Sequence, residues 1–212
     1  MAEFWESSFQ EKQTMWGFRP AASALEALHL FQRSGGKHVL IPGFGYGRNA
    51  SPFTEHGFKV TGIEISETAI ALAKKRFGDT VNVYHGAVSA MPFDQELYDG
   101  IFCYALIHLL NSKDRAKLVR DCYHQLKPGG YMVFVAISKE DAAYGQGEKV
   151  SKDRFLTRHG VTLFFYDAAS VEKEFGAYGL VEATQIQESA TPTANRPSQC
   201  FWRVLCRKEE DQ

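Results

Sequence analysis

The stretch HVLIPGFGYGRNA, residues 38–50, decides how the rest of this sequence is interpreted. Its first five residues, an apolar run at 38–42, predict a buried strand, and residues 47–57 predict a helix that ends at Gly57. The two elements are joined by three glycines spaced two residues apart, Gly43, Gly45 and Gly47. Glycine permits positive φ and lets a ligand approach the backbone, so this turn is a candidate ligand site.

Strand-like and helix-like segments alternate along the chain after this turn. Near-continuous apolar runs predict strands at residues 59–66, 81–87, 98–106 and 131–137. Ser66 is placed to cap a helix whose last turn is basic, and residues 112–126 predict a second helix, which Lys127-Pro128-Gly129-Gly130 ends. Apolar strands that alternate with helices are typical of a parallel sheet covered on both faces.

The end of the chain follows a different pattern. After a helix near residues 168–178, which Asp167 caps, come two strand-like segments, 180–189 and 198–208. Only a loop with two prolines lies between them, so these strands should pair antiparallel. We therefore predict an α/β fold: a doubly wound, mostly parallel seven-stranded sheet that ends in an antiparallel hairpin.

The composition narrows the class of protein. A chain of 212 residues favours one domain, spanning residues 1–212, and a net charge of −1 gives no general attraction for nucleic acid. No apolar run approaches the roughly 20 residues that a membrane span needs, and the N-terminus does not resemble a secretory signal. The four cysteines have no spacing typical of a metal site, so we expect free thiols, no metal and a cytoplasmic location. The sequence does not distinguish between a monomer and a homodimer.

A carboxylate follows the glycine turn at an informative distance. Glu64 ends the second predicted strand, 17 residues after Gly47, where its carboxylate can accept hydrogen bonds from both hydroxyls of a ribose. A dinucleotide fingerprint would need glycine at the sixth position of GxGxxG, but Arg48 stands there. The residues therefore favour a nucleoside cofactor and disfavour the alternative of a nicotinamide-dependent oxidoreductase.

Five segments in order resemble the motifs of the class I S-adenosylmethionine-dependent methyltransferases, over roughly residues 38 to 208. They are VLIPGFGYGRNA, VTGIEIS, HGAVSAMPF, YDGIFCYALIHLL and LKPGGYMVFVA. The resemblance implies S-adenosylmethionine as the cofactor and a small molecule as the methyl acceptor. Within the family, the thiopurine and thiol methyltransferases and the tellurite-resistance-type enzymes share partial features with this chain, which favours a thiol or other soft nucleophile.

The resemblance also implies residue roles. Gly43, Gly45 and Gly47 would lie against the methionine part and the ribose, and Glu64 would bind the ribose hydroxyls. The adenine would lie against Ile65, with Ala87 and Val88 at its edge, and Cys103 and Tyr104 would stand beside the sulfonium. The family usually has acids where this chain has Ile41 and Ala87. These departures keep a non-catalytic, methyltransferase-like binding protein as an alternative.

Two further expectations concern catalysis and access to the site. His108 is the candidate general base and Tyr104 a candidate for steering the acceptor, although both could instead serve in packing. The aromatic residues 1–30 are expected to form a lid, in which Trp16 and Arg19 close over the methionine end of the cofactor. Residues 138–166 are expected to form a cap whose polar first half is a loop.

Overall fold

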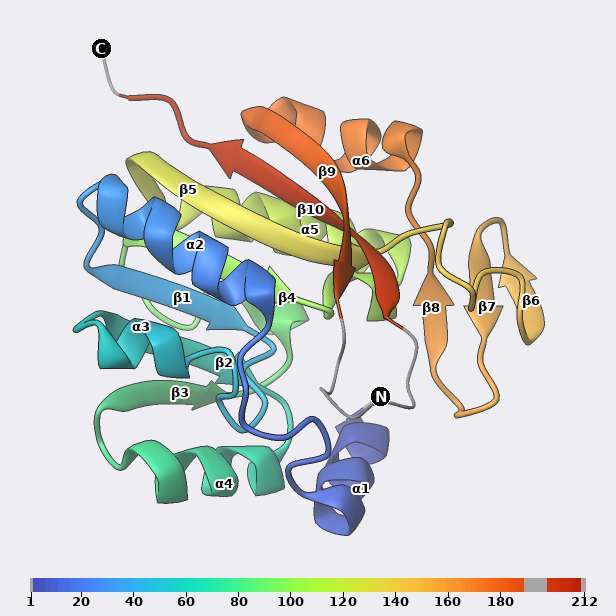
Figure 1. Cartoon of the computed structure of the whole chain (residues 1–212), viewed down its shortest axis with the longest axis horizontal. Coiled ribbons are helices and arrows are strands. Elements are labelled where there is room, and N and C mark those ends of the chain that lie inside the picture. The colour runs from blue at the N-terminus through green and yellow to red at the C-terminus, as the bar shows by residue number, and fades with distance from the viewer. Residues whose placement is uncertain (1, 189–197, 211–212) are drawn as a thin grey trace.

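A seven-stranded sheet organises the chain, which the computed structural model describes over residues 2–188 and 198–210 (Figure 1). The strand order is β3-β2-β1-β4-β5-β10-β9. The bounds are β1 His38–Pro42, β2 Lys59–Glu64, β3 Val81–His85, β4 Tyr98–Tyr104, β5 Leu126–Ile137, β9 Leu180–Glu188 and β10 Gln199–Arg207. Strands β1 to β5 pair in parallel, whereas β10 is antiparallel to both β5 and β9. The predicted fold class is confirmed.

The strand order reverses beside β1, which pairs with β2 on one side and with β4 on the other. At such a switch point the connections leave the sheet toward opposite faces, and a crevice opens at the carboxyl ends of the strands. The glycine turn follows β1 directly, so the fold places it in this crevice.

Helices cover both faces of the sheet. Buried side chains of α2 (Ala22–Arg33), α3 (Ser51–Glu55) and α4 (Glu67–Phe77) join one hydrophobic cluster, and those of α5 (Ser112–His124) and α6 (Ala168–Phe175) join the other. The predicted caps are present, because Ser66 accepts a hydrogen bond from the Ala69 N–H and Asp167 forms a capping box with Ser170. Helix α1 (Ala2–Lys12) lies apart from the sheet, against α4 (Figure 1).

Two boundaries differ from the sequence prediction. Helix α3 begins only at Ser51, because Gly45 and Gly47 have positive φ values of 57° and 80° and keep the preceding residues in turns. Helix α5 ends at His124 and strand β5 begins at Leu126, so the Lys127–Gly130 segment lies inside a strand. The reason is an extra pairing: the Gly129 and Lys208 N–H groups donate to the carbonyls of Lys208 and Gly130, respectively.

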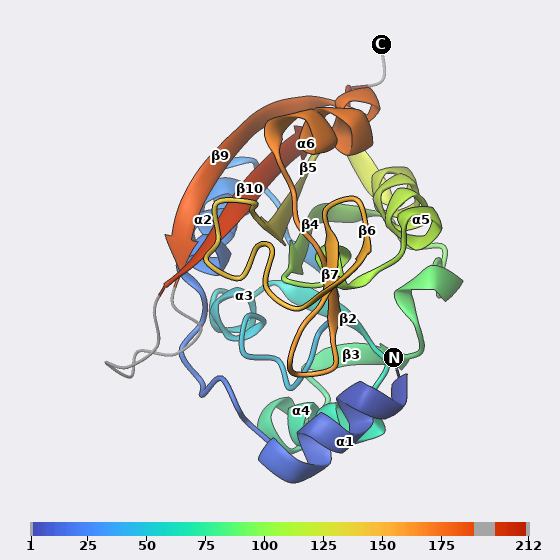
Figure 2. The ribbon, with the colours of Figure 1, turned by 90° about the vertical axis from the view of Figure 1, so that its right-hand side faces the viewer.

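Two elements were not predicted. Helix α2 falls largely within residues 1–30, yet its apolar face, including Ala24, Leu28 and Phe31, is fully buried against the sheet. The cap region holds a second, three-stranded antiparallel sheet of β6 (Glu148–Ser151), β7 (Arg154–Leu156) and β8 (Thr162–Phe164). This small sheet stands in front of the carboxyl ends of the main strands in Figure 2. The loop expected in the first half of the cap is therefore partly β-structure.

An ion-pair network attaches the cap to the main body. The Lys139 ammonium contacts Asp153 in the turn between β6 and β7 at 2.8 Å and Asp167 at the start of α6 at 2.5 Å. Burial opposes ionisation of Asp153, but the hydrogen bonds from Lys139 and Tyr144 and the positive charges of Lys139 and Lys152 together outweigh it and lower the pKa of that carboxyl; the hydrogen bond from Lys139 also lowers the pKa of Asp167. Although burial works against it, hydrogen bonds to the same carboxylates raise the pKa of Lys139.

We expect stability to depend on pH through this network. Lowered carboxyl pKa values contribute stability that is present above the unfolded value of about 4 and is lost as pH falls below it. The raised pKa of Lys139 contributes stability that is lost as pH rises above about 10.5. Urea denaturation across pH 2–8 should show a smaller acid loss in Lys139→Met than in the wild type. Identical pH profiles for the two proteins would contradict this assignment.

Candidate functional site

The glycine turn bends sharply at the carboxyl end of β1. Gly43, Gly45 and Gly47 all have positive φ, and the N–H groups of Gly43 and Phe44 donate to the Ile63 carbonyl at 2.9 and 3.0 Å. A Cβ at Gly43 would lie 3.1 Å from the Leu106 side chain, and one at Gly45 would lie 3.8 Å from Phe9. Gly43 and Gly45 therefore line the crevice, with the loop after β4 on one side and α1 on the other.

The surroundings of Gly47 differ from those of Gly43 and Gly45. A Cβ there would lie 2.4 Å from Phe77 and 2.9 Å from Phe44. Both rings belong to the hydrophobic cluster under α4. The sequence assigned this glycine to the ligand; in the structure, the place that its Cβ would take is occupied by core aromatic rings.

Glu64 lies at the end of β2 with its carboxylate turned toward the glycine turn. One oxygen accepts from the Gly45 N–H at 2.7 Å, and the other accepts from the N–H groups of Ile65 and Ser66 at 2.8 and 2.9 Å. Burial raises the pKa of Glu64, while these hydrogen bonds act in the opposite direction. An ionised carboxylate offers about four acceptor positions. Three are used, so one position on the Gly45 side remains for a ligand hydroxyl.

The end of β3 lies directly beside Glu64. The Gly86 N–H donates to the Glu64 carbonyl at 2.8 Å, and a ring nitrogen of His85 lies 3.2 Å from the Ile65 carbonyl. Ile65 and Ala87 are half-buried, and Val88 is buried. The structure thus places these three apolar side chains at adjacent strand ends. A flat ring that packs between apolar side chains would need such an arrangement.

Cys103 and Tyr104 form the end of β4, the neighbour of β1 on the opposite side from β2. Cys103 is fully buried, and burial raises the pKa of its thiol, so the thiol stays protonated and packs as an apolar group. Tyr104 is half-buried, with the Arg48 guanidinium 5.5 Å from the centre of its ring. The crevice is therefore bounded by Glu64 on the β2 side and by Tyr104 on the β4 side.

A family model described as "Methyltransferase domain" matches residues 40–134, which include the glycine turn and the ends of β2, β3 and β4. These residues, a little under half of the chain, are the part that resembles a methyltransferase domain. The resemblance to the methyltransferase family is thereby confirmed.

Curated relatives match about half of the chain. Ubiquinone biosynthesis O-methyltransferase of Nitrosospira multiformis is 32% identical over 116 residues, which are 53% of this chain and 48% of that protein. The enzyme of the same name from Coxiella burnetii is 30% identical over 112 residues, 51% of this chain and 47% of that protein. The chain thus spans about half the length of the curated relatives that it matches.

Solved structures resemble the methyltransferase domain and its flanking elements over nearly the whole chain. The 1,6-didemethyltoxoflavin-N1-methyltransferase of Burkholderia thailandensis, with bound S-adenosylhomocysteine, has a TM-score of 0.73 at 17% identity and covers 99% of this chain and 87% of its own. TehB of Haemophilus influenzae has a TM-score of 0.69 at 18% identity and covers 97% of this chain and 67% of its own. At these identities the likeness concerns the fold.

His108 of the methyltransferase domain is buried and already holds a hydrogen bond. It follows β4 in the short helix Ile107–Leu109, and its Nδ1 accepts from the Ile137 N–H at 3.1 Å. Burial lowers the pKa of His108 to about 3, so the ring stays neutral and is a weak base near pH 7. Of the two roles considered from the sequence, general base and packing residue, this geometry supports packing.

The N-terminal segment of the chain, residues 2–20, packs over the glycine turn. Phe9 is buried, and Trp16 stacks on Tyr46 with 6.3 Å between ring centres. The Tyr46 hydroxyl donates to the Gly17 carbonyl at 2.7 Å. The side chain of Arg19 is exposed, and its carbonyl accepts a hydrogen bond from the Arg48 guanidinium at 3.4 Å. Trp16 therefore packs against the turn, whereas the Arg19 side chain is exposed.

Glu6 was missed by the sequence reasoning. Its carboxylate accepts hydrogen bonds from the Thr68 N–H and from the hydroxyls of Ser66 and Thr68, which fastens α1 to the start of α4. Hydrogen bonds from Thr68 and Ser66 lower the pKa of Glu6 to about 2. No local sequence pattern indicates this contact, because 60 residues separate Glu6 from Ser66.

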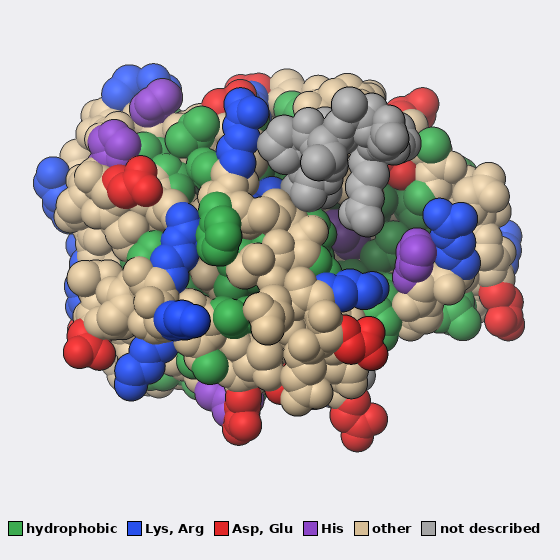
Figure 3. Space-filling model, turned by 60° about the horizontal axis from the view of Figure 1, so that its bottom comes forward, with side chains coloured by type: hydrophobic (Ala, Val, Ile, Leu, Met, Phe, Trp, Pro, Cys, Tyr) green, Lys and Arg blue, Asp and Glu red, His purple; other side chains and the backbone are tan. Residues whose placement is uncertain are grey.

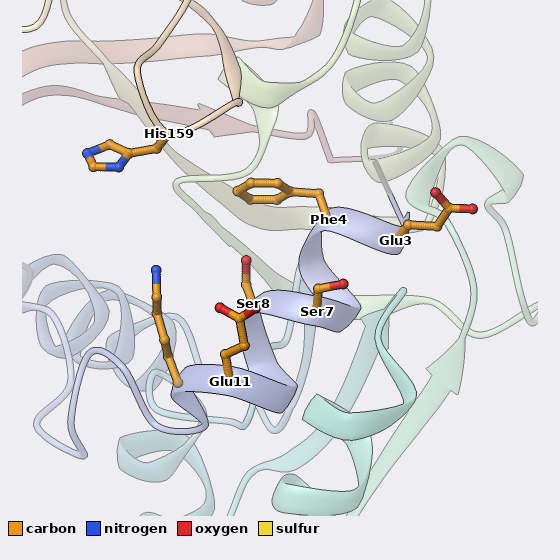
Figure 4. A pocket seen from close by; sticks show the side chains of 7 residues that line it. Glu3, Phe4, Ser7, Ser8, Glu11 and His159 are labelled. Atoms are coloured by element: carbon orange, nitrogen blue, oxygen red, sulfur yellow. The ribbon is translucent and has the colours of Figure 1, made fainter.

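The cap meets α1 across a cavity of about 490 Å³. Figure 4 shows His159, at the tip of the β7–β8 hairpin, opposite Phe4, Ser8 and Glu11 of α1. Charged side chains of both signs are scattered over the lower face of the molecule in Figure 3. The lining of the cavity likewise carries both signs, with Glu3 and Glu11 acidic and Lys12 basic.

Among the described residues, no helix is both long and apolar enough to cross a membrane. Within the same residues, no group of three His, Cys, Asp or Glu side chains is arranged to hold a metal ion. The four cysteines are buried and unpaired.

Proposed function

We propose that this protein is an S-adenosylmethionine-dependent methyltransferase that transfers a methyl group to a small-molecule acceptor. The observation that carries the proposal is the buried carboxylate of Glu64 beside the glycine turn, at the switch point of a sheet whose residues 40–134 match a methyltransferase domain. Fold neighbours bound to S-adenosylhomocysteine and to sinefungin support this choice of cofactor.

The described residues fit such a cofactor. Glu64 has one free acceptor position for a ribose hydroxyl, and Ile65, Ala87 and Val88 provide apolar surfaces for the adenine. Gly43 and Gly45 present their backbone at the carboxyl end of β1, where the ribose and methionine parts would lie, with the side chains of Leu106 and Phe9 next to them. When bound, the cofactor supplies a methyl group that its sulfonium already activates. The task of this chain is to align a nucleophile and to exclude water.

The acceptor class follows from what the site offers. His108 and Cys103 are buried and neutral near pH 7, so neither serves readily as a general base. An acceptor such as a thiol, which ionises near neutral pH, needs little help from a base. The curated relatives named as ubiquinone biosynthesis O-methyltransferases support a small acceptor and leave oxygen as the other candidate atom.

Thermal unfolding with and without ligands tests the proposal. A ligand present at about 100 times its Kd adds about 2.7 kcal/mol of stability. We expect S-adenosylmethionine and S-adenosylhomocysteine to raise the melting temperature, and NAD to leave it unchanged. No shift with either sulfur cofactor would refute the proposal. A shift without methylation of thiols, phenols or amines would instead favour a non-catalytic binding protein.

We further propose that residues 1–20 act as a lid on the cofactor. Phe9 covers Gly45, and Glu6 fastens α1 to α4 beside the Glu64 carboxylate. Deleting residues 1–20 should weaken S-adenosylhomocysteine binding at least about tenfold, because a closed lid desolvates the site and adds contact area. Calorimetric titration measures the change, and the melting temperature of the unliganded variant is the control. Unchanged affinity in a folded variant would exclude the lid.

A further inference from the structure

Glu188 is a buried acid far from the motifs that define the methyltransferase domain. It is the last residue of β9, the edge strand, which follows a long arc toward the start of α2 (Figure 2). Its side chain is about as buried as that of Glu64, at 5% exposed. One oxygen, Oε1, accepts from the Ser23 N–H at 2.6 Å and so caps the N-terminus of α2, which has no side-chain cap of its own.

The other oxygen of Glu188 is unusual. Oε2 is buried, and no described residue donates a hydrogen bond of ordinary length and angle to it. The other fully buried acids, Glu64, Asp121 and Asp141, each have both oxygens engaged. A buried carboxylate oxygen without a donor costs free energy that a ligand donor would offset.

The location of Glu188 is on the acceptor side of the crevice. Glu188 pairs with Gln199 across β9 and β10, and two residues further along β10 the ring of Phe201 lies 5.9 Å from the ring of Tyr104 at the end of β4. The segment that Glu188 caps is tied to the glycine turn, because the Ala21 N–H donates to the Asn49 side chain at 3.0 Å. Glu64 occupies the β2 side of the turn and Glu188 the β4 side, where the methyl acceptor would approach.

We propose that Oε2 of Glu188 orients the methyl acceptor by accepting a hydrogen bond from a hydroxyl or amino group that the acceptor carries near its nucleophilic atom. The inference rests on the proposed methyltransferase function and narrows its substrate class to bifunctional small molecules. An acceptor without such a donor leaves Oε2 buried and unpaired, and sites built to pair a polar group discriminate strongly against analogues that lack it.

Two acceptors that differ only in the donor group test the proposal, 2-mercaptoethanol and 2-methoxyethanethiol. The wild type should have at least about tenfold higher kcat/KM for 2-mercaptoethanol. In Glu188→Gln the amide oxygen can still accept from the Ser23 N–H, while the amide NH₂ replaces the acceptor Oε2 with a donor. This variant should lose the preference or reverse it, mainly through KM for 2-mercaptoethanol.

Glu182→Gln is the matched control, since Glu182 lies on the same strand but is exposed and paired with Arg203. It should keep the wild-type preference. A purely structural role for Glu188 would lower activity toward both acceptors equally, and that result would overturn the proposal. So would an equal rate with both acceptors, or no methylation of either, in the wild type. Thermal stabilisation by S-adenosylmethionine in the same samples shows whether the methyltransferase function itself has failed.

Discussion

Gly47→Ala is expected to lower the free energy of unfolding by about 3 kcal/mol, an unusually large effect for a single added methyl group. Gly47 has a φ of +80°, and an L-residue in that region costs about 1–2 kcal/mol. The new Cβ would also lie 2.4 Å from Phe77 and 2.9 Å from Phe44, so both rings must move. Overpacking of this kind adds roughly 1–3 kcal/mol.

Gly57→Ala separates the two causes. Gly57 has a similar φ of +76°, but a Cβ there would meet nothing within 4 Å. Its substitution should cost only the backbone strain, about 1–2 kcal/mol. Urea denaturation of both variants gives the difference, which measures the displacement of the two rings. If both variants lose the same free energy, the rings adapt without strain and the proposed packing role of Gly47 is wrong.

The role of Gly47 shows where a sequence motif stops being informative. The spacing of the three glycines predicts a turn at the end of a strand, and the structure confirms the turn. Which surface each glycine faces depends on rings from other parts of the chain: Phe77 lies in the last turn of α4, the second helix after the glycine turn. One motif therefore combines glycines that face the crevice with one that faces the core.

The elements of the main sheet were predictable because their signals are local. Buried parallel strands appear as apolar runs, and β9 and β10 are separated by too short a loop for a crossover. The small sheet of the cap gave no such signal. All four residues of β6 are exposed, and β7 and β8 have three residues each, too short to show a period of two.

The residues of the candidate site also fall into those that the sequence predicts and those that it does not. Glu64 was predictable because it directly ends a strand and lies a fixed distance from the glycine turn. Glu188 was not, since its capping contact with Ser23 spans 165 residues and depends on the curvature of β9. Long-range contacts made by single charged side chains leave no periodicity in the sequence, so they can be identified only in the folded structure.

Glu64→Ala is expected to weaken binding of S-adenosylhomocysteine about 100-fold. A hydrogen bond from a ribose hydroxyl to a buried carboxylate contributes about 1.5–3 kcal/mol, and 2.7 kcal/mol corresponds to about 100-fold in Kd. The substitution also removes the acceptor that holds the Gly45 N–H at 2.7 Å, so the turn that faces the ligand loses its anchor. Isothermal titration calorimetry measures the affinity directly.

Two controls make this result specific to the carboxylate. Glu67→Gln lies three residues further along the chain, at the exposed start of α4, and should leave Kd unchanged because it does not face the crevice. Glu64→Gln keeps one oxygen for the Ile65 and Ser66 N–H groups but turns an amide NH₂ toward the Gly45 N–H. Two donors would then face each other, so we expect a loss of affinity between those of the other two variants. Wild-type affinity in Glu64→Ala would mean that the cofactor lies elsewhere, because no other described acid lies at the glycine turn with hydrogen bonds to its backbone.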